Sequence, residues 1–232
     1  MKFSWIKAQL YALLIIALWC TSIMASLAIQ RVHIIESLGF ILINTFLCVG
    51  LFITAHDSMH GLISPNKTIN NLFGKVSLYL YGAFSFKKLK ENHMKHHLSP
   101  TSKTDPDYTK YESEGFFYWL YSFFREYYGP REYLLMHGHV LFFLWIADWN
   151  YFKVLTYYAL PAILSALQLF YFGTYLPHRH KDRHNNRHFA RSNNYPVWLS
   201  FLTCYHFGYH YEHHKYPDTP WWALPKRRSL RK

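Results

Sequence analysis

The stretch YHFGYHYEHH (residues 205–214) places four histidines within ten residues. On a helix, where successive residues are about 100° apart, His206, His210, His213 and His214 fall within roughly a third of a turn. Imidazole is the commonest metal-binding side chain, and the spacing i, i+4, i+7, i+8 directs several ring nitrogens towards one point. The stretch therefore predicts a helix with one metal-binding face.

Two shorter histidine clusters, HDSMH (residues 56–60) and HMKHH (residues 93–97), lie upstream beside apolar segments. Each alone is weak, because pairs spaced i, i+4 also occur on ordinary surfaces, but three clusters at predicted membrane exits on one face indicate a metal centre. The candidates exceed what one metal accepts, so two metals are expected. They are His56, His60, His93, His96, His97, His178, His210, His213 and His214, with His206 as an uncertain tenth.

Long uncharged segments next to the histidine clusters predict a membrane protein. Half of the 232 residues are apolar and a fifth are aromatic, a heavy load for a soluble domain. Four segments are long enough to be read as spans: residues 10–29, 38–55, 133–147 and 154–176. The sequence predicts one all-α, membrane-embedded domain over residues 1–232. It has two transmembrane hairpins, interfacial or re-entrant helices near 69–86 and 116–128, and a histidine-rich cap.

The charge distribution predicts the orientation. A net charge of +12 could indicate nucleic acid, but Lys and Arg are confined to the N-terminus, residues 87–131 and the region after 178, apart from Arg31, Lys67, Lys75 and Lys153. Such confinement is typical of positive-inside topology and of contact with anionic lipid headgroups, so no nucleic-acid partner is expected. Both termini and all three clusters are predicted on the cytoplasmic side, with only the turns at 30–37 and 148–153 outside. The three cysteines have no paired spacing and predict no disulfide framework.

The ligand types and their positions weigh against several metalloprotein classes. A zinc site would need only four ligands. Because the candidate ligands include no thiolate and no carboxylate, iron is favoured over zinc as the bound metal. A zinc intramembrane protease needs a glutamate base in HExxH, whereas this chain has Asp57 at that position. A bis-histidine haem protein needs two axial ligands deep between helices. A transporter would place its ligands near the bilayer midplane rather than at span ends.

The three histidine boxes and paired hairpins resemble the integral-membrane fatty-acid desaturase and hydroxylase superfamily. More specifically, four stretches are similar to bacterial β-carotene ketolases: FITAHDSMHG (52–61), TDPDY (104–108), LFYFGTYLPHR (169–179) and TCYHFGYHYEHHKYPDTPWWALP (203–225). The resemblance implies a bacterial cell membrane, a non-haem di-iron site, O₂ and electrons from a ferredoxin-like donor. It also implies that ring C4 of β-carotene and echinenone is oxidised to the ketone, giving echinenone and canthaxanthin. A carotenoid ring hydroxylase and a fatty-acyl desaturase are the alternatives.

The same resemblance implies roles for individual residues. One iron would draw on His56, His60, His93, His97 and neighbours, and the other on His96, His178, His210, His213 and His214. The sequence leaves open which histidine serves which iron. His206 could be a ligand or could orient a neighbour. Three carboxylates, Asp57, Asp105 and Asp107, are candidates to accept a hydrogen bond from a ligand imidazole, although Asp105-Pro106-Asp107 could simply form a turn.

Aromatic residues predict where an apolar substrate would lie. The segments 79–86, 116–128 and 169–175 are rich in Tyr and Phe. Such side chains offer planar apolar walls with little conformational entropy to lose, so these segments could line a slot for a rigid polyene. A flexible acyl chain would fit the same slot, and the lining alone leaves both substrate classes open.

Overall fold

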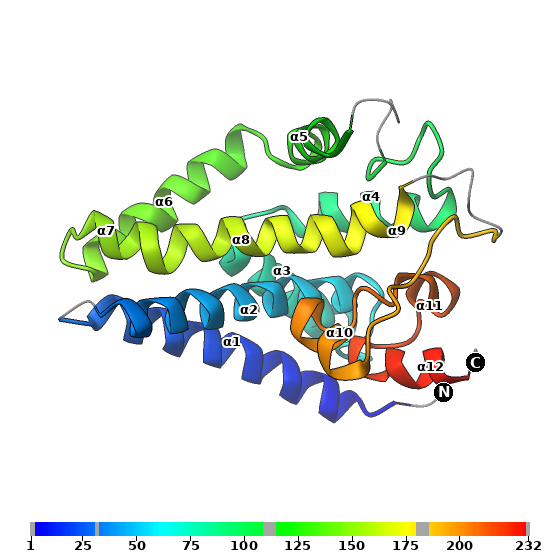
Figure 1. Cartoon of the computed structure of the whole chain (residues 1–232), viewed down its shortest axis with the longest axis horizontal. Coiled ribbons are helices and arrows are strands. Elements are labelled where there is room, and N and C mark those ends of the chain that lie inside the picture. The colour runs from blue at the N-terminus through cyan, green and yellow to red at the C-terminus, as the bar shows by residue number, and fades with distance from the viewer. Residues whose placement is uncertain (1–2, 31–32, 109–114, 180–185, 231–232) are drawn as a thin grey trace.

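The computed structural model describes residues 3–30, 33–108, 115–179 and 186–230. Parts of the predicted cationic loops lie outside these residues. Within them the regular structure is helical, and the long helices lie side by side, with the shorter C-terminal helices packed at one end (Figure 1). That end also holds the first turn of α1, so both ends of the described chain lie close to each other.

Three of the described helices are long and apolar enough to cross a membrane. They are α1 (Trp5–Ala28), α2 (Ile34–Met59) and a continuous helix, Tyr151–His178, which comprises α7 (Tyr151–Val154), η2 (Leu155–Ala159), α8 (Leu160–Leu169), η3 (Phe170–Tyr175) and α9 (Leu176–His178). They cover the predicted spans 10–29, 38–55 and 154–176. The predicted span 133–147 lies in α6 (Pro130–Ile146), a helix of 17 residues. At 1.5 Å per residue α6 is roughly 25 Å long, slightly less than a hydrocarbon core.

Polar residues within the segment 69–86 hold α3 (Lys67–Gly82) against α2. Asn70 donates from Nδ2 to the carbonyl of Ser58 at 2.8 Å, and Ser58 Oγ donates to the carbonyl of Asn70 at 2.6 Å. A Cβ on Gly74 would lie 2.5 Å from Ser58 Oγ of α2 and 2.2 Å from the Phe86 ring, so a glycine is required where the helices meet. Residues that interrupt the apolar pattern therefore form a helix interface, which fixes the end of α2 that carries the first histidines.

Two further helices complete the region around these histidines. α4 (Phe86–Leu98) carries HMKHH, and α5 (Gly115–Tyr127) carries the aromatic segment predicted at the membrane interface. Ser85 is the N-cap of α4, and its side chain accepts a hydrogen bond from the Lys88 amide.

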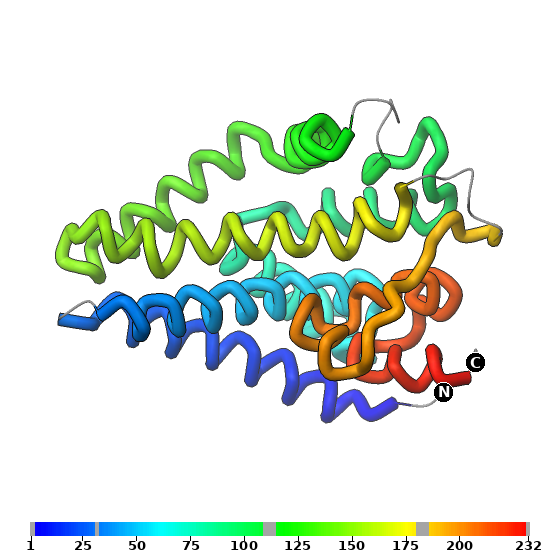
Figure 2. The backbone as a smooth tube through the Cα atoms, viewed as in Figure 1, coloured from blue at the N-terminus to red at the C-terminus, as the bar shows by residue number. Residues whose placement is uncertain are grey.

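The prediction of one helix over residues 205–214 is wrong. α10 (Val197–Cys204) ends before the motif and α11 (His210–Lys215) begins within it. Tyr205 and His206 have φ of 47° and 63°, and a right-handed helix cannot continue through left-handed residues. The Tyr205 ring stacks on Phe46 with centroids 4.5 Å apart and lies against Gly50, so packing on α2 holds the break in place. Beyond α11 the chain returns through η5 (Trp221–Ala223) and α12 (Leu224–Ser229) along the ends of α1 and α2 (Figure 2).

A buried polar residue on α2 compensates for a proline in the long helix. In α-helical register residue 161 would donate to the carbonyl of Tyr157, but Pro161 has no N–H. Asn44, which is fully buried, donates from Nδ2 to that carbonyl at 2.9 Å. Its Oδ1 accepts from Ser22 at 2.6 Å, so α1 joins the same network. In a bilayer an unpaired carbonyl is costly, and this network fixes the three long helices relative to one another.

We expect Asn44→Leu to lower the free energy of unfolding by about 1–3 kcal/mol, because the Tyr157 carbonyl loses its donor in an apolar interior. The measurement is unfolding in detergent, with Pro161→Ala as the second arm of a double-mutant cycle. Alanine at 161 restores an N–H for the same carbonyl, so Asn44→Leu should cost less in that background. If Asn44→Leu lowered the free energy of unfolding equally with Pro161 and in the Pro161→Ala background, Asn44 would not be compensating for the N–H that Pro161 lacks.

Candidate metal centre

Four helical segments bring the predicted histidines to one end of the molecule. The last turn of α2 and the residue after it carry one pair, α4 carries three histidines, the end of α9 carries one and α11 carries three. These residues are His56 and His60; His93, His96 and His97; His178; and His210, His213 and His214. The break before α11 lets a short helix point its histidines at α2 and α4, which a continuation of α10 could not do.

The first histidine group consists of His56, His60, His93 and His213, whose possible ligand atoms all lie within 4.8 Å of one another. The Nε2 atoms of His56 and His213 are 3.1 Å apart, and those of His60 and His93 are 2.8 Å apart. The resemblance implied that His213 would join the other iron. The structure instead places it in this group, because neighbouring residues of α11 diverge by about 100°.

The second histidine group consists of His96, His178, His210 and His214, again with ligand atoms within 4.8 Å. His214 Nε2 lies 3.1 Å from that of His96 and 3.0 Å from that of His210. All four side chains are buried. α4 and α11 therefore each contribute to both groups, which makes the groups neighbours.

His97 lies between the two groups. Its Nε2 atom is 3.1 Å from that of His93 and 2.8 Å from that of His213, both in the first group. Its ring stacks on His214 of the second group with centroids 4.2 Å apart. It is half-buried, whereas both of its contacts in the first group are buried. His97 is thus placed with the first group and touches the second.

The spacing of these nitrogens suits metal coordination. Two imidazole nitrogens each about 2.1 Å from one ion, and at right angles around it, lie about 3.0 Å apart. The Nε2 pairs in both groups are separated by 2.8–3.1 Å. Paired imidazoles can share only one proton between two facing nitrogens, so a cluster of many facing Nε2 atoms cannot satisfy itself by hydrogen bonds alone. The donor set therefore fits two metal ions of imidazole preference.

Hydrogen bonds to the opposite ring nitrogen orient some of these imidazoles. His96 Nδ1 lies 2.9 Å from Asp105 Oδ2, and His178 Nδ1 lies 2.9 Å from the carbonyl of Phe189. Such contacts fix the proton on Nδ1 and leave Nε2 for a metal. Asp57 lies 3.5 Å from His56 Nδ1 and accepts the Trp221 amide at 3.1 Å.

Burial keeps several of these histidines in the metal-binding protonation state. Desolvation, followed by repulsion from neighbouring histidines, holds the pKa of His93, His213 and His214 well below the ordinary value. Neutral imidazole is the form that binds a metal. At His96 burial lowers the pKa, but the hydrogen bond and charge of Asp105 outweigh burial and the pKa is raised. Burial also raises the pKa of Asp107 to about 6.

His206 lies outside both groups. Its ring stacks on Tyr209, with centroids 5.7 Å apart, and on Trp221. Burial lowers its pKa to about 4. The helical phase that aligned it with His210 in the sequence does not exist, because the helix is broken between them. His206 is positioned to pack against aromatic rings.

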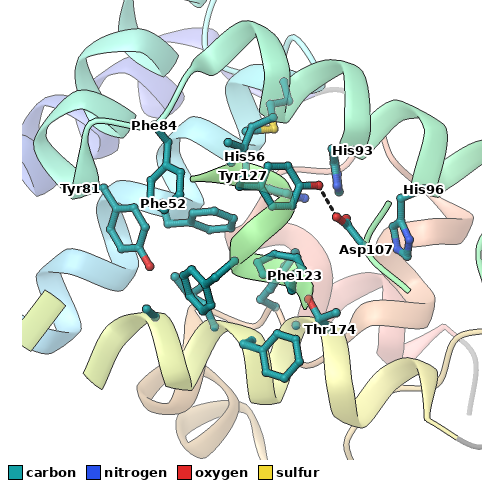
Figure 3. Close-up of a pocket in the computed structure, with 18 of the residues that line it drawn as sticks. Phe52, His56, Tyr81, Phe84, His93, His96, Asp107, Phe123, Tyr127 and Thr174 are labelled. Carbon is teal, nitrogen blue, oxygen red and sulfur yellow. Dashed lines mark hydrogen bonds between the residues drawn. The ribbon is translucent and has the colours of Figure 1, made fainter. Parts of the chain in front are cut away.

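An aromatic pocket opens beside the histidines. Each of the three aromatic segments contributes to it: residues of 79–86, 116–128 and 169–175. His56, His93, His96 and His210, from both groups, also line it. Figure 3 shows Phe52, Phe84 and Tyr81 towards one side of the pocket and the imidazoles of His93 and His96 towards the other.

Sequence reasoning missed Phe207 as part of this pocket, and it missed the pairing of Tyr127 with Asp107. Phe207 follows the helix break, and its ring lies where a side chain on Gly173 would go, 2.3 Å from a Cβ built there. Tyr127 at the end of α5 donates a hydrogen bond to Asp107 inside the pocket. The signal for Tyr127 was only its place in an aromatic run, and nothing in the sequence pairs it with a residue twenty positions earlier.

The family profile described as fatty acid desaturase matches residues 35–143 and 131–231. The histidines of both groups and His97 all fall within these ranges. The chain therefore belongs to the fatty acid desaturase family.

Within that family, similar proteins are carotenoid ketolases. A beta-carotene ketolase of Paracoccus sp. (strain N81106 / MBIC 01143) is 42% identical over 202 residues, covering 85% of this chain and 81% of the relative. A beta-carotene ketolase of Paracoccus sp. (strain PC1) is 43% identical over 188 residues, covering 80% and 76%. A zeaxanthin 4-ketolase of Chlamydomonas reinhardtii is 35% identical over 199 residues, covering 80% of this chain and 42% of the relative. No solved structure gave a significant match.

Proposed function

We propose that this chain is a β-carotene ketolase, which oxidises ring C4 methylene groups to ketones and converts β-carotene through echinenone to canthaxanthin. The observation that carries the proposal over a fatty-acyl desaturase is the 42–43% identity to proteins named beta-carotene ketolases, and the aromatic pocket lined by histidines of both groups fits it. A pocket of this composition accepts a rigid apolar ring and holds it next to the metal-binding nitrogens. These relatives are named beta-carotene ketolases and align with 80–85% of this chain, which supports ketone formation at ring C4.

The cofactor in this proposal is a pair of irons. The first histidine group with His97 would hold one iron, and the second histidine group the other. When bound, they would supply reduction of O₂ and oxidation of a C–H bond, with electrons from an external donor, proposed to be ferredoxin-like. An all-imidazole donor set without thiolate supports iron over structural zinc.

The protein's own residues bind and position the substrate. The pocket aromatics exclude water and hold the ring, and Asp105 keeps the Nδ1 proton of His96 in place. C4 is allylic to the conjugated polyene, so its C–H bonds are weak, and positioning decides between C4 and its neighbour C3. A displacement of about 1 Å could change that choice substantially.

The proposed setting is a bacterial cell membrane, with α6 as a fourth span and the metal centre, both termini and the basic loops on the cytoplasmic side. The clustering of Lys and Arg on segments around the histidines supports this orientation. Anionic lipid headgroups would contact the same residues. Single cysteines introduced at Asp148 and at Lys103 test it: an external reagent should label the first only, and external labelling at Lys103 would reverse the orientation.

Expression in a host that makes β-carotene tests the function. We expect echinenone and canthaxanthin to accumulate, visible as a red shift of the pigment and identified by mass. Zeaxanthin in their place would favour the ring hydroxylase. Unchanged carotenoids with new double bonds in membrane lipids would favour the fatty-acyl desaturase. An empty-vector host provides the baseline for all three readouts.

A further inference from the structure

The aromatic pocket contains a polar pair close to the histidines. Tyr127 donates its phenolic O–H to Asp107 Oδ1, and both residues line the pocket (Figure 3). The Tyr127 side chain is buried and Asp107 is half-buried. A carboxylate has two oxygens and about four acceptor sites, so the bond from Tyr127 leaves Asp107 with further acceptor capacity.

This pair is tied to the metal centre by a continuous set of hydrogen bonds. The Asp107 amide donates to Asp105 Oδ1 at 2.9 Å, and Asp105 Oδ2 lies 2.9 Å from His96 Nδ1. Trp119 Nε1 donates to the Asp107 carbonyl at 2.9 Å. The Asp107 backbone is therefore held in place relative to His96 by the buried Asp105 carboxylate and by Trp119.

Ketone formation at a methylene makes a demand that a single hydroxylation does not. In the first round O₂, two electrons and two protons convert one C–H to C–OH and release water. In the second round the remaining C–H of the same carbon reacts in the same way, and the resulting gem-diol loses water to give the carbonyl. The alcohol must therefore stay bound, and a hydroxyl group inside an aromatic pocket is costly unless it is hydrogen-bonded.

The geometry points to Asp107 and Tyr127 as a hydroxyl-binding pair that retains the C4 alcohol and directs its remaining C–H at the metal centre. This inference rests on the proposed ketolase function. With the apolar ring bound, the two side chains satisfy each other, so the first round carries no penalty. Once the alcohol forms, Asp107 accepts its O–H and Tyr127 can donate to its oxygen.

The test measures the ratio of 4-hydroxy to 4-keto products formed by the purified, iron-loaded enzyme. Tyr127→Phe deletes the O–H and keeps the ring, so we expect the ratio to rise about tenfold while consumption of β-carotene changes less. Asp107→Asn, which replaces one acceptor oxygen by a donor, should move the ratio in the same direction. Tyr121→Phe makes the same chemical change on an exposed position of α5 and should leave the ratio unaltered.

A binding measurement separates hydroxyl recognition from catalysis. Under anaerobic conditions, where no turnover occurs, the wild-type enzyme should bind the 4-hydroxy derivative about tenfold more tightly than β-carotene, and Tyr127→Phe should abolish that preference. A parallel fall of both products with an unchanged ratio, or an unchanged binding preference, would overturn the inference and leave the pair a structural contact. A wild-type enzyme that leaves C4 unoxidised would instead overturn the proposed function, and the inference with it.

Discussion

His213→Ala and His214→Ala should each reduce ketone formation to background. These neighbours on α11 belong to different groups: His213 contacts His56 and His97, and His214 contacts His96 and His210. Each substitution removes one imidazole from one group and leaves the other group complete. Each variant should therefore retain about one of two irons, because affinity depends on the full ligand set. The assays are pigment analysis and metal content of the purified proteins.

His137→Ala is the matched control. His137 is exposed on α6 and its Nδ1 lies 2.7 Å from the Tyr133 carbonyl of its own helix. This control should keep both irons and full turnover. Full ketone formation by either α11 variant would contradict the assignment of that histidine to the metal centre.

Asp105→Asn should have the second largest effect, a fall of about 10–100-fold in activity or iron affinity. Asp105 accepts from His96 Nδ1 and the Thr101 amide through one oxygen and from the Asp107 amide through the other. Asparagine has a single acceptor oxygen, so its NH₂ group must face a donor. The His96 ring then loses its orientation or the loop loses its anchor.

Iron loss to a chelator, measured alongside the unfolding midpoint, separates these effects from simple destabilisation. Asp218→Asn serves as the reference, because the side chain of Asp218 is 70% exposed. Asp105→Asn should release iron faster without a change in the unfolding midpoint. Asp218→Asn should change neither the rate of iron release nor the midpoint. Equal iron retention in the two variants would mean that Asp105 only forms the turn.

Sequence periodicity predicted the parts of the site that lie on regular helices. HDSMH ends α2 and HMKHH lies on α4, so their i, i+4 spacing translated directly into a shared face. The spacing of His206 and His210 wrongly predicted a shared helical face, because left-handed residues at 205 and 206 break the helix. That break depends on the packing of Tyr205 against Phe46 and Gly50, over 150 positions away, and no local pattern encodes such a contact.

Pairings between distant segments were likewise beyond the sequence. The grouping of His213 with His56 follows from the angle at which α11 meets α2, and the Asp107–Tyr127 pair joins a loop to the end of α5. The three aromatic segments were recognisable from composition. Their convergence on one pocket beside the histidines required the tertiary arrangement.

The metal content of the purified wild-type protein shows directly whether the two adjacent histidine groups each hold an iron. Elemental analysis with an optical spectrum should give about two irons per chain and no haem absorption. Stoichiometric zinc, a haem spectrum, or a single iron in protein that fully converts β-carotene to canthaxanthin would contradict the proposed pair of irons.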